Sequence, residues 1–227
     1  MLFKLLTLFL TLLSLSQGTM DAYVDSMSLG GNLFLVNREY SIDQTYVPRD
    51  LVRPQVLCLY DTVTLRKEAA QALEQLFRAA KDEADYDLIA VSGYRSFGKQ
   101  RDIHQNKINS VGRKAALRVS APPGCSEHQL GLAVDIGRKK APGLNESFGS
   151  SPEGKWVAEN CHRIGFIIRY KAEWEEITGY AYEPWHIRYV GKEHAKVIYQ
   201  LDIPFETYIA QLRDAVWTVG PEGEDTQ

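Results

Sequence analysis

SEHQLGLAVDI, at residues 126–136, is the stretch around which the fold of this chain is organised, and EPWH, at residues 183–186, is its partner. In the second half of the first stretch, large apolar side chains occupy every other position and Asp135 lies between two of them. Successive side chains of a β-strand point to opposite faces of a sheet. A strand here would therefore bury the apolar side chains on one face and turn Asp135 towards the other, away from the core.

Together the two stretches supply imidazole and carboxylate groups that suit a metal centre. A catalytic zinc ion takes three protein ligands and keeps a further position open for water. His128, Asp135 and His186 make such a set, and Glu183 is left over to act as a base. Isolated His and Asp residues also occur at protein surfaces, or in the core with their hydrogen bonds made. These residue types alone therefore fit either a metal site or ordinary structural residues.

Length and composition favour one globular domain. The chain has 227 residues, enough to bury a substantial core, and a formal net charge of -3. Such a charge balance gives no reason to expect binding to nucleic acid or to an anionic membrane surface. A small molecule or a peptide is the expected partner.

The first residues are typical of a secretory signal peptide. One lysine is followed by a short Leu-rich run and then by small and polar residues, whereas a membrane-spanning helix needs about 20 apolar residues. We expect a signal peptide over residues 1–18, a flexible lead-in over 19–30 and a single catalytic domain over 31–220. No Ala-x-Ala cleavage site is present, so an uncleaved N-terminal anchor stays open as an alternative.

Three cysteines, Cys58, Cys125 and Cys161, are too few for a disulfide framework and include no Cys-x-x-Cys zinc pair. Cys125 and Cys161 could pair outside the cell, but free thiols are the preferred interpretation. A thiol nucleophile formed by Cys125 and His128 is disfavoured, because near neighbours on an extended chain point apart.

The order of helices and strands predicts a mixed α+β fold. Apolar residues recur with helical spacing from Leu65 to Ala84, and an apolar run that begins at Leu88 ends in a Gly turn with Arg95 at its exit. Further strands are expected at 33–37, 166–170 and 183–191, and further helices at 98–117 and 156–164. A helical region interrupted near Pro204 is expected at 194–212, and a Gly-, Pro- and Ser-rich loop at 137–154.

Pro184 decides between two arrangements of the second stretch. Glu183-x-x-His186 on a helix would suit a carboxylate-bridged di-iron site. A proline breaks a helix interior and makes the residue before it extended, so the helical arrangement fails. In an extended segment Glu183 can still lie beside a metal-bound His186, where a carboxylate can take a proton from water and return it to an amine leaving group.

Other hydrolytic classes lack their motifs. The sequence has no His-Glu-x-x-His pair and no Gly-x-Ser-x-Gly elbow, which excludes thermolysin-like metalloproteases and disfavours serine peptidases. Arg95 would suit a carboxylate or a developing oxyanion, although without further context a surface arginine is the simpler interpretation. His104, His162 and His194 are expected to be solvated and receive no role, and Trp185 is the expected wall of a cleft.

Four segments of the chain stand out in order: SGYRS at 92–96, SEHQLGLAVDI at 126–136, GFIIRY at 165–170 and EPWHIRYVG at 183–191. Together they resemble the VanY-like D-alanyl-D-alanine carboxypeptidases. The resemblance runs from about Leu33 to Leu201. It implies an α+β fold of the hedgehog and D-Ala-D-Ala-peptidase type, with a small antiparallel sheet, helices packed on one side and an open zinc cleft.

The resemblance also assigns roles by position. The family pattern Ser-x-His-x-x-Gly-x-x-x-Asp supplies two zinc ligands, at His128 and Asp135, and Glu-x-Trp-His supplies the base Glu183 and the third ligand His186. Ser-Gly-Tyr-Arg-Ser places at Arg95 a residue that stabilises the substrate or the transition state. Residues that bind the terminal carboxylate of the substrate fall on Gln100, Ser126 and Ser120.

The implied protein is a zinc-dependent D-alanyl-D-alanine carboxypeptidase with one Zn2+ per chain that removes the C-terminal D-alanine from peptidoglycan stem peptides. It would be exported and act outside the cell, in the periplasm or at the cell wall. Two alternatives stay open: an L,D-carboxypeptidase that trims tetrapeptide stems, and a zinc-containing module that binds the cell wall without catalysis. No nucleic-acid partner is expected, and no stable membrane insertion unless the N-terminal segment stays uncleaved.

Overall fold

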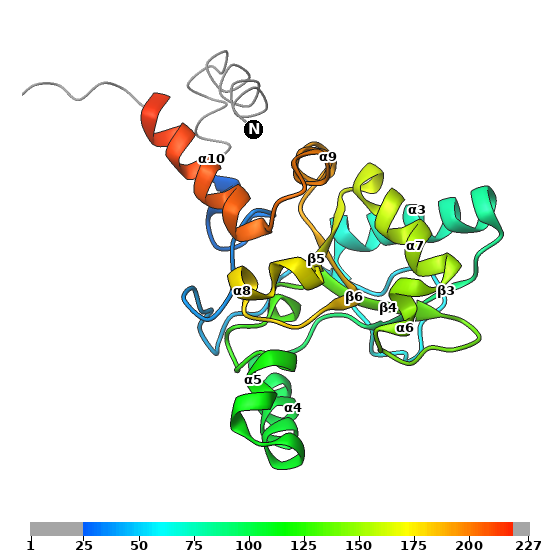
Figure 1. The fold of residues 1–227 in the computed structure, drawn as a ribbon, viewed down its shortest axis with the longest axis horizontal. Helices are drawn as coiled ribbons and strands as arrows, with labels where there is room; N and C mark the ends of the chain where they lie inside the picture. The colour runs from blue at the N-terminus through cyan, green and yellow to red at the C-terminus, as the bar shows by residue number, and fades with distance from the viewer. Residues whose placement is uncertain (1–24, 220–227) are drawn as a thin grey trace, which may run out of the picture.

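A four-stranded antiparallel sheet lies at the centre of the structure, a computed structural model that describes residues 25–219 (Figure 1). The strand order is β3-β4-β6-β5, so β6 lies between β4 and β5. The strands of this sheet are β3 (Leu88–Ser92), β4 (Ala133–Arg138), β5 (Phe166–Tyr170) and β6 (Glu183–Tyr189). A smaller sheet pairs β1 (Leu51–Val52) with β2 (Leu65–Arg66).

Helices connect and cover these strands. In Figure 1, α3 and α7 lie together over the sheet, whereas α4 and α5 form a pair that projects from the body of the molecule. The α-helices are α3 (Lys67–Ala84), α4 (Phe97–Val111), α5 (Arg113–Val119), α6 (Ser147–Ser150), α7 (Pro152–Asn160), α8 (Glu175–Thr178), α9 (Lys192–Leu201) and α10 (Phe205–Val219). Short 3-10 helices are η1 (Glu127–Leu130), η2 (Cys161–Ile164) and η3 (Ala172–Trp174).

The two faces of the central sheet have different environments, because side chains alternate along each strand. Val134 of β4 and Ile187 of β6 belong to the main apolar core, which also contains the buried residues of α3. Asp135, His186 and Arg188 occupy the intervening positions and are buried on the opposite face. The predicted split between apolar residues and Asp135 in this stretch therefore matches the strand.

The predicted helix at Leu65–Ala84 is present but begins two residues later. Leu65 and Arg66 pair with Val52 and Leu51 in the small sheet, so α3 starts at Lys67. Its Ala and Leu residues at helical spacing form the buried face, as predicted, and include Ala69, Ala72, Leu73, Leu76 and Ala80.

A second apolar cluster lies beside α9 and α10. Leu33 and Leu35 are buried in it together with Ile167 of β5 and Val190. The strand predicted at 33–37 is wrong, since these residues form no regular element. Their side chains are buried against helices, and an apolar run of this length does not distinguish such burial from strand pairing.

Two other predicted boundaries are wrong. The expected helix at 98–117 is divided into α4 and α5 at Gly112, which has a left-handed φ of 81°. The expected loop at 137–154 contains α6 and the start of α7. Ser151 caps α7, its side chain accepting a hydrogen bond from the Gly154 N–H, and Pro152 occupies the first turn, where proline is favoured.

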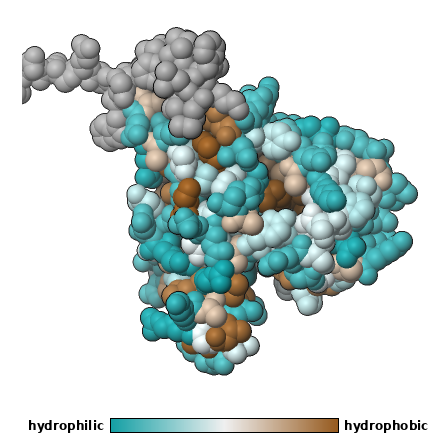
Figure 2. Space-filling model, viewed as in Figure 1, coloured by the Kyte–Doolittle hydropathy of each residue, from teal (hydrophilic) through white to brown (hydrophobic). Residues whose placement is uncertain are grey.

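The expected α+β fold with a small antiparallel sheet is confirmed. Between residues 25 and 219, no helix has the length and apolar character needed to cross a membrane. The face seen in Figure 2 is mainly hydrophilic, with hydrophobic residues in separate small groups. The signal peptide expected at 1–18 lies outside the described residues, and the single domain at 31–220 stays a prediction.

Candidate active site

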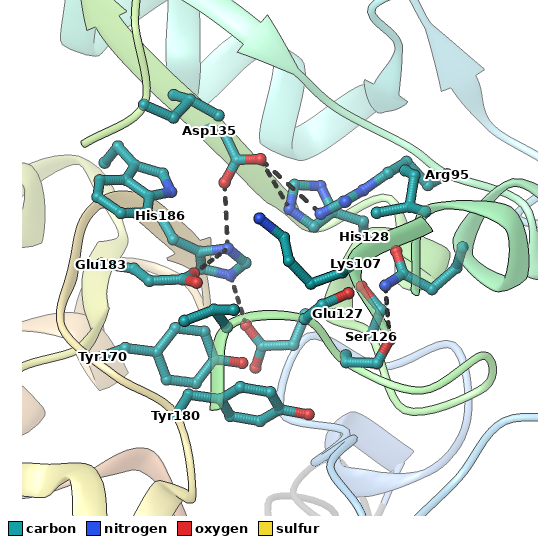
Figure 3. Close-up of a pocket in the computed structure, with 17 residues that line it drawn as sticks. Arg95, Lys107, Ser126, Glu127, His128, Asp135, Tyr170, Tyr180, Glu183 and His186 are labelled. Carbon is teal, nitrogen blue, oxygen red and sulfur yellow. Dashed lines mark hydrogen bonds and ion pairs between the residues drawn. The ribbon is translucent and has the colours of Figure 1, made fainter. Parts of the chain in front are cut away.

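Two neighbouring strands bring Asp135 and His186 together. They are register partners of β4 and β6, and His186 Nδ1 lies 3.2 Å from Asp135 Oδ1. His128 comes from η1, with its Nε2 3.3 Å from Asp135 Oδ2 (Figure 3). All three residues are buried, and one donor atom from each lies within 4.8 Å of the others. The structure thus brings together the three residues predicted as metal ligands.

Hydrogen bonds determine which nitrogen each histidine presents to this cluster. His128 Nδ1 donates to the Gly93 carbonyl at 2.7 Å, because a carbonyl oxygen can only accept. Its Nε2 is buried and makes no hydrogen bond. In His186, Nε2 lies 3.1 Å from Glu127 Oε2, so Nδ1 faces Asp135. Two imidazole nitrogens and a carboxylate oxygen, one of the nitrogens unpartnered, fit a zinc ion.

Charge and burial strongly perturb the three residues. Burial and the neighbouring Arg95 lower the pKa of His128 to about 4. Burial also lowers the pKa of His186, but its contacts with Asp135 and Glu127 outweigh this effect and raise that pKa to about 9. Burial opposes ionisation of Asp135, yet the two histidines hold its pKa well below the usual range. Such strong perturbation by specific partners is typical of functional sites.

Glu183 lies beside the cluster at the start of β6. Its Oε2 is 3.9 Å from His186 Nδ1, and Pro184 follows it within the extended strand, as predicted. Burial raises the pKa of Glu183 to about 7, although the positive charge of His186 acts in the opposite direction. A carboxyl group that titrates near neutral pH can both take and return a proton.

Arg95 reaches the same cluster from the segment after β3. Its backbone N–H donates to the His128 carbonyl at 3.1 Å, and its Nη2 lies 3.8 Å from Asp135 Oδ2. The buried Nε makes no hydrogen bond. Burial lowers the pKa of Arg95, opposed by the charges of Asp135 and Glu183. An arginine stays charged in proteins, so a cation with unused donors borders the site.

A cavity of about 240 Å³ opens beside the cluster. The three residues predicted to bind a terminal carboxylate, Gln100, Ser120 and Ser126, are buried and line this cavity. Gln100 Nε2 donates to the Ala121 carbonyl at 2.7 Å, which fixes the amide orientation, and its Oε1 makes no hydrogen bond. Trp185 also lines the cavity, as expected of a cleft wall.

The expectation that His104 is solvated is wrong. His104 is buried on α4, and its Nδ1 lies 3.4 Å from the Ser120 hydroxyl. It therefore supports a serine of the cavity wall from behind. A polar helix in the sequence gave no sign of this contact, because it depends on how α4 packs against residue 120.

Sequence reasoning also missed Glu127, which lies under His186 and contacts Arg169 and Arg188. The sequence does contain a feature that predicts a buried carboxylate of this kind. Both arginines occur within otherwise apolar strand segments, and a buried guanidinium needs a carboxylate partner. Tyr170 and Tyr180 were missed as well: the Tyr170 ring lies 4.9 Å from the His186 ring, and both tyrosines line the cavity.

All three cysteines are free thiols, in agreement with the preferred interpretation. Cys125 is half-buried and does not line the cavity, so it has no access to the cluster as a nucleophile. Cys161 lies within the main core.

Comparisons with known proteins point in one direction. The sequence model of a family described as VanY, D-alanyl-D-alanine carboxypeptidase, matches residues 62–192. YodJ of Bacillus subtilis strain 168 is 48% identical over 186 residues, which cover 80% of this chain and 68% of YodJ.

Solved structures of similar chains have the same fold. The LdcB LD-carboxypeptidase is 48% identical with a TM-score of 0.73, covering 78% of this chain and 85% of that one. A variant of the vancomycin-resistance D,D-pentapeptidase VanY, solved in complex with Zn(II), is 35% identical with a TM-score of 0.65, covering 78% of this chain and 98% of that one.

Proposed function

The chain belongs to the VanY family of D-alanyl-D-alanine carboxypeptidases, and on this premise we propose that it is a zinc-dependent carboxypeptidase that removes the C-terminal D-alanine from peptidoglycan stem peptides. The observation that carries the proposal is the buried cluster of His128, Asp135 and His186 with Glu183 at its edge. The zinc complex of the VanY relative supports the choice of metal.

His128, Asp135 and His186 would hold one zinc ion per chain, through His128 Nε2, His186 Nδ1 and the Asp135 carboxylate. When bound, zinc supplies Lewis acidity and lowers the pKa of a water molecule towards about 7. The chain supplies the remaining steps through residues that border the same cavity.

Glu183 acts as the proton shuttle. Its carboxylate takes a proton from the attacking water and delivers it to the amine of the departing D-alanine. Its burial and its raised pKa of about 7 support both roles, since the proton is held only loosely near neutral pH. The Glu183 carboxylate lies 3.9 Å from His186 Nδ1, so it is next to the predicted metal ligand but is not itself one of the three ligands.

Arg95 stabilises the negative charge that develops on the scissile carbonyl oxygen. It is a partly buried cation, and such a charge acts more strongly in a site that excludes water. Ser126, Ser120 and Gln100 bind the free carboxylate of the terminal residue. The serine hydroxyls and the second hydrogen of Gln100 Nε2 can donate to this carboxylate.

Two substrates fit this chemistry. The name of the family describes cleavage between two D-alanines, the bond at the end of a pentapeptide stem. Cleavage of a tetrapeptide between an L-centre and D-alanine is the second candidate, and it is favoured by the higher identity to LdcB, 48% against 35% for VanY. We propose that the protein acts on these stems at the cell wall, after export.

Mass spectrometry of muropeptides tests the proposal. Pentapeptide and tetrapeptide stems are incubated with the purified chain, with and without a chelator. Loss of one D-alanine from the pentapeptide alone, blocked by chelator, establishes the D,D reaction, and loss from the tetrapeptide establishes the L,D reaction. No loss from either stem would overturn the proposal in favour of a binding module without catalysis.

A further inference from the structure

Glu127 is the most buried carboxylate around the candidate metal site. It is 1% exposed and lies directly under the ring of His186 (Figure 3). Its Oε2 is 3.1 Å from His186 Nε2, on the side of the ring away from Asp135. Its Oε1 accepts hydrogen bonds from Arg169 Nε at 2.7 Å and from Arg188 Nη1 at 2.9 Å. The carboxylate is therefore held between two guanidinium groups and one imidazole.

Both guanidinium groups are themselves fixed by distant parts of the chain. Arg169 makes a bidentate pair with Glu206 of α10, at 2.9 and 2.5 Å. Arg188 Nη2 donates to the backbone carbonyls of Asn32 and Phe34, both at 3.0 Å. Two carboxylates and two guanidinium groups balance their charges in this cluster, and neither arginine can turn away from Glu127 without losing its other partners.

The position of Glu127 fixes the form of His186. A carboxylate accepts only, so Nε2 carries the hydrogen that it shares with Glu127. Asp135 faces Nδ1, but a metal ion bound there would replace any hydrogen on that nitrogen, so Nδ1 is the nitrogen left to bind metal. That nitrogen is the one that faces Asp135 and Glu183. Hydrogen bonds of this kind orient metal-binding histidines and increase their basicity.

We propose that Glu127 is a positioning residue of the metal site, which commits His186 to bind through Nδ1 and is itself held in place by Arg169 and Arg188. The inference rests on the proposed zinc-dependent function. It extends the metal site to α10 and to the segment around Asn32, which contact the arginines but not the ligands. Glu206→Gln, which removes one charge of the pair with Arg169, should accordingly weaken metal binding.

A purely structural ion cluster would have the same arginine contacts but would not need the third contact, to His186. Metal affinity separates the two roles. Zinc affinity is measured by competition with a chromophoric chelator for the wild type, for Glu127→Gln and for Glu83→Gln. Glu83 is the matched control, because it is also a carboxylate paired with an arginine, and its partner Arg163 lies outside the Glu127 cluster.

Glu127→Gln should bind zinc about 10- to 100-fold more weakly, the usual effect of losing such a partner, and Glu83→Gln should bind as the wild type does. Equal affinity of Glu127→Gln and the wild type would overturn the inference and leave the proposed function intact. A wild type that binds no zinc would instead overturn the proposed function.

A measurement on the wild type keeps the inference testable if Glu127→Gln fails to fold. Nitrogen-15 NMR of the zinc-loaded protein reports which imidazole nitrogen of His186 carries a hydrogen. We expect a protonated, exchange-protected Nε2 and a metal-bound Nδ1. A metal-bound Nε2 would exclude the Glu127 contact and the role assigned to it.

Discussion

Asp135 and His186 are register partners on adjacent strands, so the central sheet itself sets the 3.2 Å between the carboxylate and the imidazole. Because this carboxylate is the hub that contacts both histidines, Asp135→Ala should abolish zinc retention and hydrolysis together. The core side chains of β4 lie on the other face, so the fold should persist. Elemental analysis after desalting measures bound zinc, and Asp87→Ala, an exposed aspartate just before β3, is the control. Stoichiometric zinc in Asp135→Ala would refute the ligand assignment.

Removal of the metal should lower the free energy of unfolding. An ion that binds only the folded state stabilises it by about 2.7 kcal/mol when its free concentration is 100 times Kd. Thermal unfolding in excess zinc and in chelator gives the difference. For Asp135→Ala, the stability in excess zinc should equal the stability in chelator. If the stability of the wild type is also unchanged by chelator, the protein holds no metal.

Glu183→Gln should keep zinc but lose hydrolysis. The amide has nearly the same shape as the carboxyl group but cannot carry the proton, and loss of such a group lowers rates by about 10²- to 10⁴-fold. Turnover of a muropeptide and bound zinc are measured on one preparation. Glu173→Gln changes an exposed glutamate of η3 and should behave as the wild type. A Glu183→Gln enzyme with unchanged turnover would remove Glu183 from the mechanism.

Two glycines near the site should respond to alanine in opposite ways. A Cβ at Gly93 would overlap the backbone carbonyl of Thr64, and the Gly93 carbonyl is the acceptor that orients His128. Gly93→Ala should therefore lower both stability and zinc affinity. Gly98 lies in α4 with open space around its Cβ position, so Gly98→Ala should stabilise by about 0.5–1 kcal/mol. Chemical denaturation compares the two, and equal effects would contradict the packing described.

Cys161 should resist alkylation in the folded protein. It is 2% exposed, and burial raises its pKa to about 12, so at pH 8 the thiol stays protonated and unreactive. Raising the pH increases the thiolate fraction, but access still requires opening of the core. Mass spectrometry after alkylation should find Cys161 modified only in denaturant. A mass that rises on reduction would instead indicate a disulfide.

The strands that carry the site were predictable because their signals are local. Alternation around Asp135 and the break imposed by Pro184 determine face and conformation without tertiary information. The sequence predictions failed for residues whose environment depends on how separate helices and strands pack together. The apolar residues near Leu33 are buried against α9 and α10, and His104 meets Ser120 only because α4 packs beside it.

Glu127 illustrates the same limit within the site. It adjoins His128 in the sequence, yet its partners Arg169, Arg188 and His186 come from β5 and β6. Arginines in apolar strands indicate that a buried carboxylate pairs with them. The contact of the Glu127 carboxylate with the metal ligand His186, however, depends on the strand order β4-β6-β5.

The two-faced strands also constrain how this sequence can diverge. Insertion or deletion of one residue within β4 or β6 would exchange the faces and turn Asp135 or His186 into the apolar core. Evolution can therefore alter these strands by substitution but not by changes of length. The segment between β4 and α6 contributes Leu144 to the cavity wall and lies outside the sheet, so we expect it to tolerate changes of length. Divergence in peptide preference should accumulate in that segment while the sheet keeps its register.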